Sequence, residues 1–313
     1  MKLYSMARVC FYRSSIFFLS IACLFNSADI KAWSFKGHSV IAQSAAEGLP
    51  KRTRIQIQEI LKKGPWCEEQ SRCLNAVAKA SAWPDRIRDK SIAQLFSLYG
   101  SGQVPKALRE YQNQNSTTWH FVNVLYLSPG GAIVYASEEA GKTKTCPPSV
   151  FGLLFEIWPK LLTSYRQSTD SRDKALVLAF ILHLAADAYQ PLHLLSGLDA
   201  ECKGDKGGNG FCLDKHSGTQ KRCKKNLHSL WDQGFGVFDS DLTVPDHEFD
   251  GNYTSLESAQ NFLKPHLKFI YPQRVSEVHG RHYQARARSL TESASTHAMA
   301  HLMKTLNELV LGK

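Results

Sequence analysis

Two histidine–aspartate pairs have the spacing that places both side chains on one face of a helix. His183 and Asp187 are four residues apart in an otherwise apolar run, and His228 and Asp232 repeat that spacing in NLHSLWD. His193 follows the first pair closely enough to return to the same region. Burying an unpaired carboxylate is costly, so the first pair predicts a buried His–Asp hydrogen bond or a bound cation, and the second an exposed polar face or a further ligand pair. Imidazole nitrogen combined with carboxylate oxygen favours zinc.

Four more candidate ligands lie upstream of these pairs. Asp85 occurs in AWPDRIR and His120 in TWHFVN, both where regular structure is expected to break, and Trp33 and His38 occur in WSFKGH. If the chain is cut after Ala32, Trp33 becomes the N-terminal residue. Its free α-amino group could then bind a metal together with its own carbonyl in a five-membered chelate.

The first 32 residues have the pattern of a signal peptide. Lys2, Arg8 and Arg13 precede a ten-residue apolar run, Ile16–Phe25, which is too short to span a membrane comfortably. The alternative is an uncleaved N-terminal anchor. We therefore expect a signal peptide over residues 1–32, a single domain over residues 33–313, and a secreted or periplasmic protein.

The cysteines remaining after removal of the leader predict disulfide bonds. They are Cys67, Cys73, Cys146, Cys202, Cys212 and Cys223, an even number in an exported chain. Cys67 and Cys73 are close enough for a local bridge, and the pairing of the others stays open. A zinc–thiolate site is the alternative, but the chain has no CxxC pair.

The composition is that of a globular protein with a basic surface. Hydrophobic residues make up 43% of the chain and charged residues 21%, and the formal net charge is +10. Without the leader the charge is about +7, which favours polyanionic partners such as nucleic acid or an anionic membrane.

Apolar residues recur mostly at helical spacing, so the sequence predicts a mainly α-helical fold. Strand signals are few: Trp119–Leu127 alternates weakly, and Glu201–Arg222 could hold a short hairpin. Pro191 is expected to end or kink the almost uniformly apolar helix over Ser171–Tyr189. The expected helices are Gly37–Leu49, Arg52–Leu61, Cys73–Trp83, Pro148–Ser164, Ser171–Tyr189, Leu227–Gly234, Ser255–Tyr271 and Gln284–Leu311.

Taken together, the stretches WSFKGH, WPDRIR, WHFVN, HLAADAYQPLH, GGNG and NLHSLWD resemble one family. This is the zinc-dependent single-strand nuclease and 3′-nucleotidase family, known as the S-one/P-one nucleases. The resemblance implies a compact helical domain of the phospholipase C/P-one nuclease type, stapled by disulfides, with a trinuclear zinc cluster. Its implied ligands are Asp85, His120, His183 and Asp187 for one zinc; Trp33, His38 and a shared Asp187 for the second; and His193, His228 and Asp232 for the third.

The resemblance also implies the catalytic residues Asp85, Arg88 and Asp187. Three Zn²⁺ ions against three aspartates leave a positive site that suits a phosphodiester, and zinc can lower the pKa of a water molecule toward neutrality, so no protein nucleophile is needed. The third zinc would stabilise the leaving O3′. Arg88 corresponds to a phosphate-binding arginine; the alternative is an ordinary surface arginine.

Base recognition is implied for a second set of residues. Phe121 stands where the family has a base-stacking aromatic residue, and Asn123 stands where the family often has Asp, so base preference could differ. Gly207, Gly208 and Asn209 match a glycine-rich turn that contacts the base, or else form a plain flexible loop.

Single-stranded DNA or RNA and 3′-nucleotides are therefore the expected substrates, with no protein partner and no stable membrane insertion after signal cleavage. The main alternative is a zinc-dependent phospholipase C. Those enzymes carry Glu at the last ligand, where this chain has Asp232, and they lack the GGN turn. A basic binding protein that has lost catalysis is a second alternative, although all nine ligand positions are filled.

Overall fold

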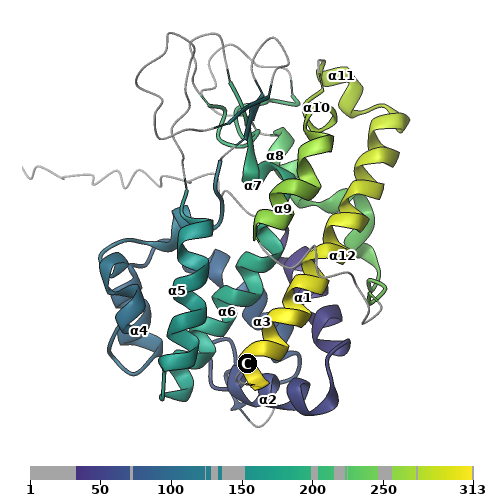
Figure 1. Ribbon diagram of the computed structural model, residues 1–313. Helices are drawn as coiled ribbons and strands as arrows, with labels where there is room; N and C mark the ends of the chain where they lie inside the picture. The colour runs from purple at the N-terminus through teal and green to yellow at the C-terminus, as the bar shows by residue number, and fades with distance from the viewer. Residues whose placement is uncertain are drawn as a thin grey trace, which may run out of the picture.

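The computed structural model describes residues 33–70, 73–123, 125–127, 133–135, 152–198, 204–214, 223, 225–245, 256–272 and 274–311. Helices account for most of this part of the chain (Figure 1). The α-helices are α1 (Phe35–Glu47), α2 (Lys51–Leu61), α3 (Ala76–Ala82), α4 (Ile92–Tyr99), α5 (Leu154–Gln167), α6 (Ser171–Asp187), α7 (Pro191–Leu194), α8 (Leu227–Asp232), α9 (Leu256–Leu263), α10 (Leu267–Ile270), α11 (Val275–Val278) and α12 (Arg281–Leu311). The expectation of a mainly α-helical fold is confirmed.

Helix α6 lies at the centre of the main hydrophobic core. Every residue from Ala175 to Asp187 is buried, and α1, α2, α3, α4, α5 and α12 all contact this helix (Figure 1). Asp170 caps its first turn by accepting hydrogen bonds from the backbone N–H groups of Arg172 and Asp173. A helix that is apolar on all sides is stable only when surrounded in this way, which is why its polar residues need partners.

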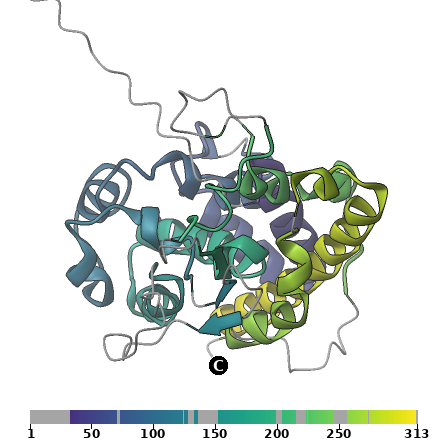
Figure 2. The same ribbon diagram turned by 90° about the horizontal axis from the view of Figure 1, so that it is seen from above.

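A second, smaller core lies beside the first. It joins α7 and α8 to α10, α11 and the first turns of α12 through Leu192, Trp231, Ile270 and Tyr283. The Tyr283 hydroxyl accepts a hydrogen bond from Trp231 Nε1 (3.1 Å) and donates to the carbonyl of Ile270 (2.9 Å). Helix α8 is therefore fixed from the side of α10 and α12. Figure 2 shows the ribbon from above, with the yellow-green C-terminal helices along one side of the molecule.

A small sheet connects distant parts of the chain. Strand β1 (Leu125–Leu127) pairs antiparallel with β2 (Ile133–Tyr135) and parallel with β3 (Leu195–Gly197), so the order is β2-β1-β3. Strand β3 follows α7 directly. The sheet therefore holds the chain after His120 beside the chain after His193.

Short 3₁₀ helices fill several connections. They are η2 (Pro84–Arg86), η3 (Lys106–Tyr111), η4 (Ser116–Trp119), η5 (Gly234–Asp239) and η7 (Lys264–His266). Asp85 and His120 thus lie at breaks in regular structure, as expected, because η2 contains Asp85 and η4 ends immediately before His120.

Two disulfide bonds lie in the described residues. Cys67 pairs with Cys73, which confirms the expected local bridge, and Cys212 pairs with Cys223. Cys146 and Cys202 lie outside the described residues, as do residues 1–32, where the sequence predicts a signal peptide.

Several expected helix boundaries are wrong for local reasons. The helix expected from Pro148 begins at Leu154, because Gly152 has a φ of +109° and Leu153 donates its N–H to the carbonyl of Thr118. The helix expected from Cys73 begins at Ala76, because Cys73 is held by its disulfide and Asn75 adopts a left-handed conformation.

Other expected elements are shorter, broken or were missed. The Ser255–Tyr271 helix breaks into α9, η7 and α10 around Pro265, the central helix ends at Asp187 before α7 opens at Pro191, and α8 ends at Asp232. Among the described residues of the alternating stretch Trp119–Leu127, the strand is β1. The described part of the expected Glu201–Arg222 hairpin forms turns, and α4 was not expected.

Among the described residues, no helix has both the length and the apolar character needed to cross a membrane.

Candidate metal centre and base pocket

One group of ligand atoms gathers where η2, η4 and α6 meet. His120 Nδ1 lies 2.8 Å from His183 Nε2 and 3.1 Å from Asp187 Oδ2, and His183 Nε2 lies 3.1 Å from the same Asp187 oxygen. Asp85 Oδ1 completes the group at 3.5 Å from His183 Nε2 and 3.7 Å from His120 Nδ1. All four side chains are essentially buried.

These separations match the edges of a small coordination polyhedron. Four nitrogen or oxygen ligands placed about 2.0–2.1 Å from a zinc ion in a tetrahedron lie about 3.3 Å from one another. The five measured separations range from 2.8 to 3.7 Å. The atoms are thus arranged as ligands of one small cation would be.

His38 and Trp33 lie on the other side of Asp187. His38 Nε2 is 3.2 Å from Asp187 Oδ1, and the His38 ring stacks on His183 with centroids 3.7 Å apart. The indole N–H of the buried Trp33 donates to the carbonyl of Ala186 at 2.9 Å. The two oxygens of Asp187 therefore face two different sets of residues, which is the arrangement that a shared ligand requires.

A third group forms between α7 and α8. His228 Nε2 is 3.6 Å from Asp232 Oδ1, and the His193 and His228 rings are stacked with centroids 5.2 Å apart. His193, His228 and Asp232 each offer an atom within 4.8 Å of the others. Gln190 Nε2 donates to Asp232 Oδ1 at 2.7 Å and so orients the carboxylate.

Backbone carbonyls fix the ring orientation of three of the histidines. The Nδ1–H groups of His183, His193 and His228 donate to the carbonyls of Ser81, His120 and Gly207, each at 2.6 Å. Each ring therefore presents Nε2 to its ligand group. A second hydrogen bond of this kind is typical of metal-binding histidines.

Several buried polar atoms of these groups have no hydrogen-bond partner. They are both ring nitrogens of His38, Nε2 of His120 and of His193, Oδ2 of Asp85 and Oδ1 of Asp187. Buried polar atoms are nearly always satisfied, so such a concentration needs an explanation. Bound metal ions would satisfy three of these atoms, His38 Nε2, His193 Nε2 and Asp187 Oδ1, and the residues present fit a cluster of bound cations.

The electrostatics also indicate a missing positive charge. Burial raises the pKa of Asp232 well above its ordinary value, and Asp85 and Asp187 add to this against the hydrogen bond from Gln190. Burial lowers the pKa of His193 to about 3, so this ring is neutral and cannot compensate the carboxylate. A bound cation would allow Asp232 to remain ionised.

In the first group the charges are arranged differently. Burial alone would lower the pKa of His183, but Asp187 and Asp85 raise it to about 10. Burial would likewise raise the pKa of Asp187, yet His183 and the neighbouring histidines lower it well below its ordinary value. Both shifts show that the two carboxylates favour a positive charge at this group, which a bound metal ion would supply.

Arg88 lies against the first group rather than on the open surface. Its side chain is 11% exposed, and Nη2 donates to Asp85 Oδ1 and lies 3.1 Å from His120 Nδ1. The surface-arginine alternative is therefore wrong. A guanidinium so placed is available to a phosphate bound beside the ligand groups.

A pocket opens next to the third group. Its walls include Phe121, Asn123 and His228, and its other lining residues are Thr117, Thr118, Leu192 and Lys206. Asn123 Oδ1 is buried without a hydrogen-bond partner. An aromatic ring and an unpaired amide oxygen in one small pocket suit a flat, polar ring such as a base.

The turn at Gly207 and Gly208 lies against His228 and is not itself among the residues that line the pocket. A Cβ on Gly207 would lie 2.2 Å from the carbonyl oxygen of Leu192, and both glycines have positive φ (64° and 80°). The turn therefore has a defined backbone conformation and is not a plain flexible loop. The Asn209 side chain donates to the carbonyl of Lys206 and so stabilises the turn.

Asp205 and Tyr271 support this turn, and neither residue was expected from sequence analysis. The Asp205 carboxylate accepts hydrogen bonds from the N–H groups of Gly197 and Gly208 (2.9 Å each), from Ser196 Oγ (3.0 Å) and from the Tyr271 hydroxyl (2.8 Å). The turn is thus tied to β3 and to α10.

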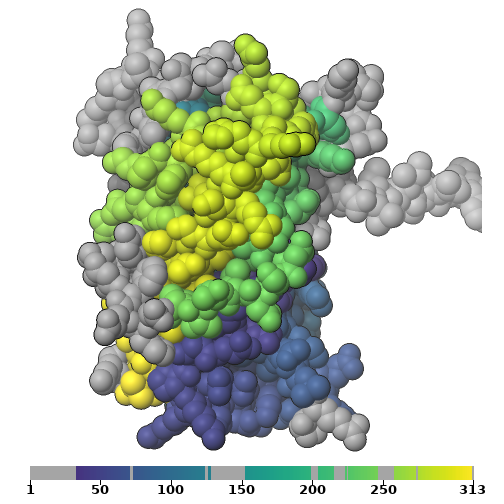
Figure 3. Space-filling model, turned by 90° about the vertical axis from the view of Figure 1, so that its right-hand side faces the viewer, coloured from purple at the N-terminus to yellow at the C-terminus, as the bar shows by residue number. Residues whose placement is uncertain are grey.

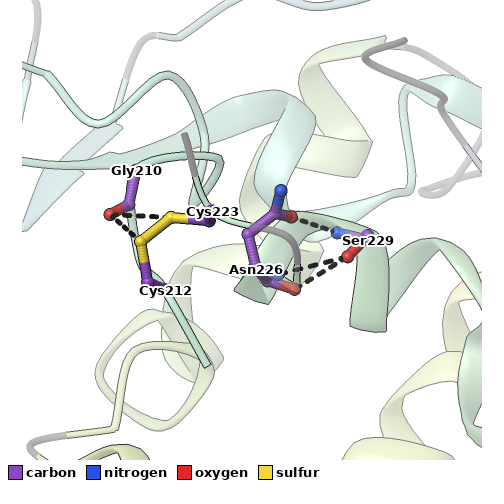
Figure 4. The surroundings of a disulfide bond; sticks show 5 residues. All are labelled: Gly210, Cys212, Cys223, Asn226 and Ser229. Carbon is purple, nitrogen blue, oxygen red and sulfur yellow. Dashed lines mark hydrogen bonds between the residues drawn. A yellow bond between two sulfur atoms is a disulfide. The ribbon is translucent and has the colours of Figure 1, made fainter. Parts of the chain in front are cut away.

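The Cys212–Cys223 disulfide lies at the far side of the same loop (Figure 4). Both sulfur atoms approach the carbonyl oxygen of Gly210, at 3.7 and 3.8 Å. Three residues later Asn226 and Ser229 form a capping box at the start of α8. The disulfide and the cap hold the turn and the helix that carries His228 together.

The comparison with known families agrees with this arrangement. A family model described as S1/P1 Nuclease matches residues 33–309, the bulk of the chain. The chain therefore belongs to the S1/P1 nuclease family, a class of metal-dependent phosphodiesterases that act on nucleic acid. No curated protein matches the chain.

The close approach at Gly207 leads to a prediction. Gly207→Ala should reduce nuclease activity about 10- to 100-fold. The new Cβ would clash with the carbonyl oxygen of Leu192, and relief of that clash would shift the Gly207 carbonyl that orients His228. Gly102→Ala is the matched control, since Gly102 has a φ of +95° but no atom within 4 Å of its Cβ. Activity and thermal unfolding of both variants test this. Equal losses of activity would mean that backbone strain alone, and not the contact with Leu192, explains the glycine.

Proposed function

We propose that this chain is a secreted zinc-dependent nuclease and 3′-nucleotidase. It hydrolyses phosphodiester bonds of single-stranded DNA and RNA, and 3′-nucleotides, to give 5′-phosphate products. The observation that carries the proposal is the direct contact between a base-sized pocket and the third ligand group, since His228 belongs to both. Family membership supports the same class of reaction.

The ligand groups suit three zinc ions. One would be held by Asp85, His120, His183 and Asp187, the second by Trp33, His38 and the shared Asp187, and the third by His193, His228 and Asp232. Zinc held there supplies Lewis-acid polarisation of the phosphodiester and lowers the pKa of water toward neutrality. The mixture of imidazole and carboxylate ligands, without a thiolate, supports zinc.

The base pocket would fix the nucleotide that is released with a free 3′-hydroxyl. Phe121 offers a ring face for stacking, and the unpaired Oδ1 of Asn123 accepts a hydrogen bond from a base N–H. The sugar of this nucleotide would lie beside His228, so its O3′ is the atom nearest the third group. A base in this pocket requires unstacking, which favours single strands over duplexes.

Arg88 would act on the scissile phosphate. Its guanidinium lies at the first ligand group, where Nη2 contacts Asp85 and His120, and its Nε, which has no hydrogen-bond partner, belongs to the planar fork that recognises phosphate oxygens. Holding two oxygens of the phosphate stabilises the extra negative charge of the transition state.

Export of the chain is supported by two features. The apolar run near the N-terminus has the length of a signal peptide. The two disulfide bonds of the described residues are typical of oxidising compartments.

Product analysis tests the proposed function. Purified mature protein, loaded with zinc, is incubated with single-stranded DNA, RNA, 3′-AMP and phosphatidylcholine vesicles. We expect 5′-mononucleotides from both nucleic acids and adenosine from 3′-AMP. Products that carry 3′-phosphates would reject the assignment of the third group to O3′, and release of phosphocholine instead of nucleotides would identify a phospholipase C.

The N-terminus gives a second prediction. The mature chain should begin at Trp33, because an amide nitrogen has no available lone pair whereas a free amine can bind zinc. Adding one residue before Trp33 should remove about one zinc per chain and most of the activity, while circular dichroism remains unchanged. Mass spectrometry must confirm that the added residue is retained, and metal analysis gives the zinc content.

Trp33→Phe with a free N-terminus is the matched control. It keeps the amine but loses the indole N–H that donates to the carbonyl of Ala186. This variant should keep its zinc and lose mainly stability. An extended chain with full zinc and full activity would contradict an amino-terminal ligand.

A further inference from the structure

Positive charge is concentrated in one segment toward the C-terminus of the chain. Residues 264–288 contain six Lys or Arg residues and one acidic residue, Glu277, so this segment alone carries +5. The whole chain has a formal charge of +10, part of which belongs to the leader. The basic character of residues 33–313 is therefore mostly local.

The cations of this segment are on the surface and mostly without acidic partners. Lys268, Arg274, Arg281 and Arg286 are exposed, and none of them forms an ion pair with a carboxylate among the described residues. By contrast, Arg288 pairs with Glu292 at 3.1 Å. We call the four unpaired residues the α10–α12 basic surface; α10 to α12 lie together in Figure 1, and Figure 3 shows α12 along one face of the molecule.

This surface is built on the elements that form the site. The Tyr271 hydroxyl, one residue after α10, donates to Asp205, which holds the turn of Gly207 and Gly208. Lys206 lies between Asp205 and Gly207 in the sequence; it is exposed and lines the base pocket. A single loop therefore separates the pocket from α10.

The surface also contains an aromatic platform for a guanidinium. The Arg286 guanidinium carbon lies 4.2 Å from the centroid of the Phe269 ring, and Phe269 in turn contacts Tyr283 and Trp231. Stacking of this kind holds the arginine in a defined place at the surface. Trp231 is the residue before Asp232, so the platform rests on the helix that carries the third group.

We propose that the α10–α12 basic surface binds the phosphate backbone of a single-stranded nucleic acid beyond the nucleotide held in the base pocket. The inference rests on the proposed function, because it assigns the path of a longer substrate at the same site. These four exposed cations lie on the segment that Tyr271 and Asp205 tie by hydrogen bonds to the turn beside the pocket, and they would form an electrostatic track for successive phosphates. Short substrates do not extend to it.

The chemistry of the surface favours nucleic acid over an anionic membrane. The apolar side chains Leu267, Ile270, Val278 and Tyr283 point inward into the second core. Among the large apolar residues described in the segment, Val275 is the exposed one, with 38% of its surface accessible. A surface that enters a bilayer presents an apolar face beside its cations, and this one does not.

The test compares two double variants of equal charge. Lys268→Glu with Arg281→Glu alters the α10–α12 basic surface without touching the stacked Arg286. Lys51→Glu with Arg52→Glu, at the exposed start of α2, is the matched control at the opposite end of the molecule (Figure 1). Both are assayed on a long oligothymidylate and on the dinucleotide between roughly 50 and 200 mM salt.

For the long strand, the surface variant should raise KM about tenfold at low salt and reduce the slope of log KM against log salt by about 1.4, the value for two lost phosphate contacts. Its activity on the dinucleotide and that of the α2 variant on either substrate should stay unchanged. Binding of a phosphorothioate oligothymidylate, followed by fluorescence anisotropy, provides a readout without turnover.

Three results would overturn the inference. Equal effects of the two double variants would mean that the net charge of the protein, and not this surface, determines strand affinity. An unchanged KM and an unchanged affinity for the long strand would show that the surface does not bind the strand. Loss of binding to phosphatidylserine vesicles with unchanged oligonucleotide binding would identify a membrane contact instead. A wild-type protein that fails on the dinucleotide would reject the proposed function separately, because strand affinity is measured without hydrolysis.

Discussion

The burial of His183 and Asp187 in the last turn of α6 is the constraint on which the rest of the structure depends. Both side chains are fully buried at the end of a helix in which every residue from Ala175 onward is buried, and an uncompensated charge there is very costly. The surrounding elements provide polar partners for these two side chains. Helix α3 supplies the carbonyl of Ser81, α1 supplies His38, and η2 and η4 place Asp85 and His120 beside them. The helices that form the core are therefore also those that assemble the ligand groups.

The third group links this core to the second one. Helix α8 presents His228 and Asp232 toward α7 and packs Trp231 against α10 and α12. Asp205 ties the glycine turn to Tyr271, and the turn in turn fixes the ring of His228. One set of hydrogen bonds therefore connects α10, the glycine turn and the third ligand group.

The sequence predicted the helical class and the grouping of His and Asp residues, because the four-residue spacing is read directly from a helix. It could not predict the partners that orient these residues. Gln190 and Asp205 have no periodic signal, and the carbonyls of Ser81, His120 and Gly207 act through backbone geometry. Strands β2 and β3 were not expected, and β1 was marked by no more than weak alternation over Trp119–Leu127. Strands β1 and β3 have three residues each, too short for a clear alternating pattern, and pair across about 70 residues of sequence.

Zinc content measured together with stability tests the central claim most directly, namely that bound cations compensate the buried ligand groups. Mature protein purified without chelator should contain about three zinc ions per chain by elemental analysis. Removing them should lower the melting temperature, because ions that bind only the folded state stabilise it. Readdition of Zn²⁺ should restore both zinc content and melting temperature. Fully active protein with one zinc or fewer, or an unchanged melting temperature after complete removal, would contradict this account.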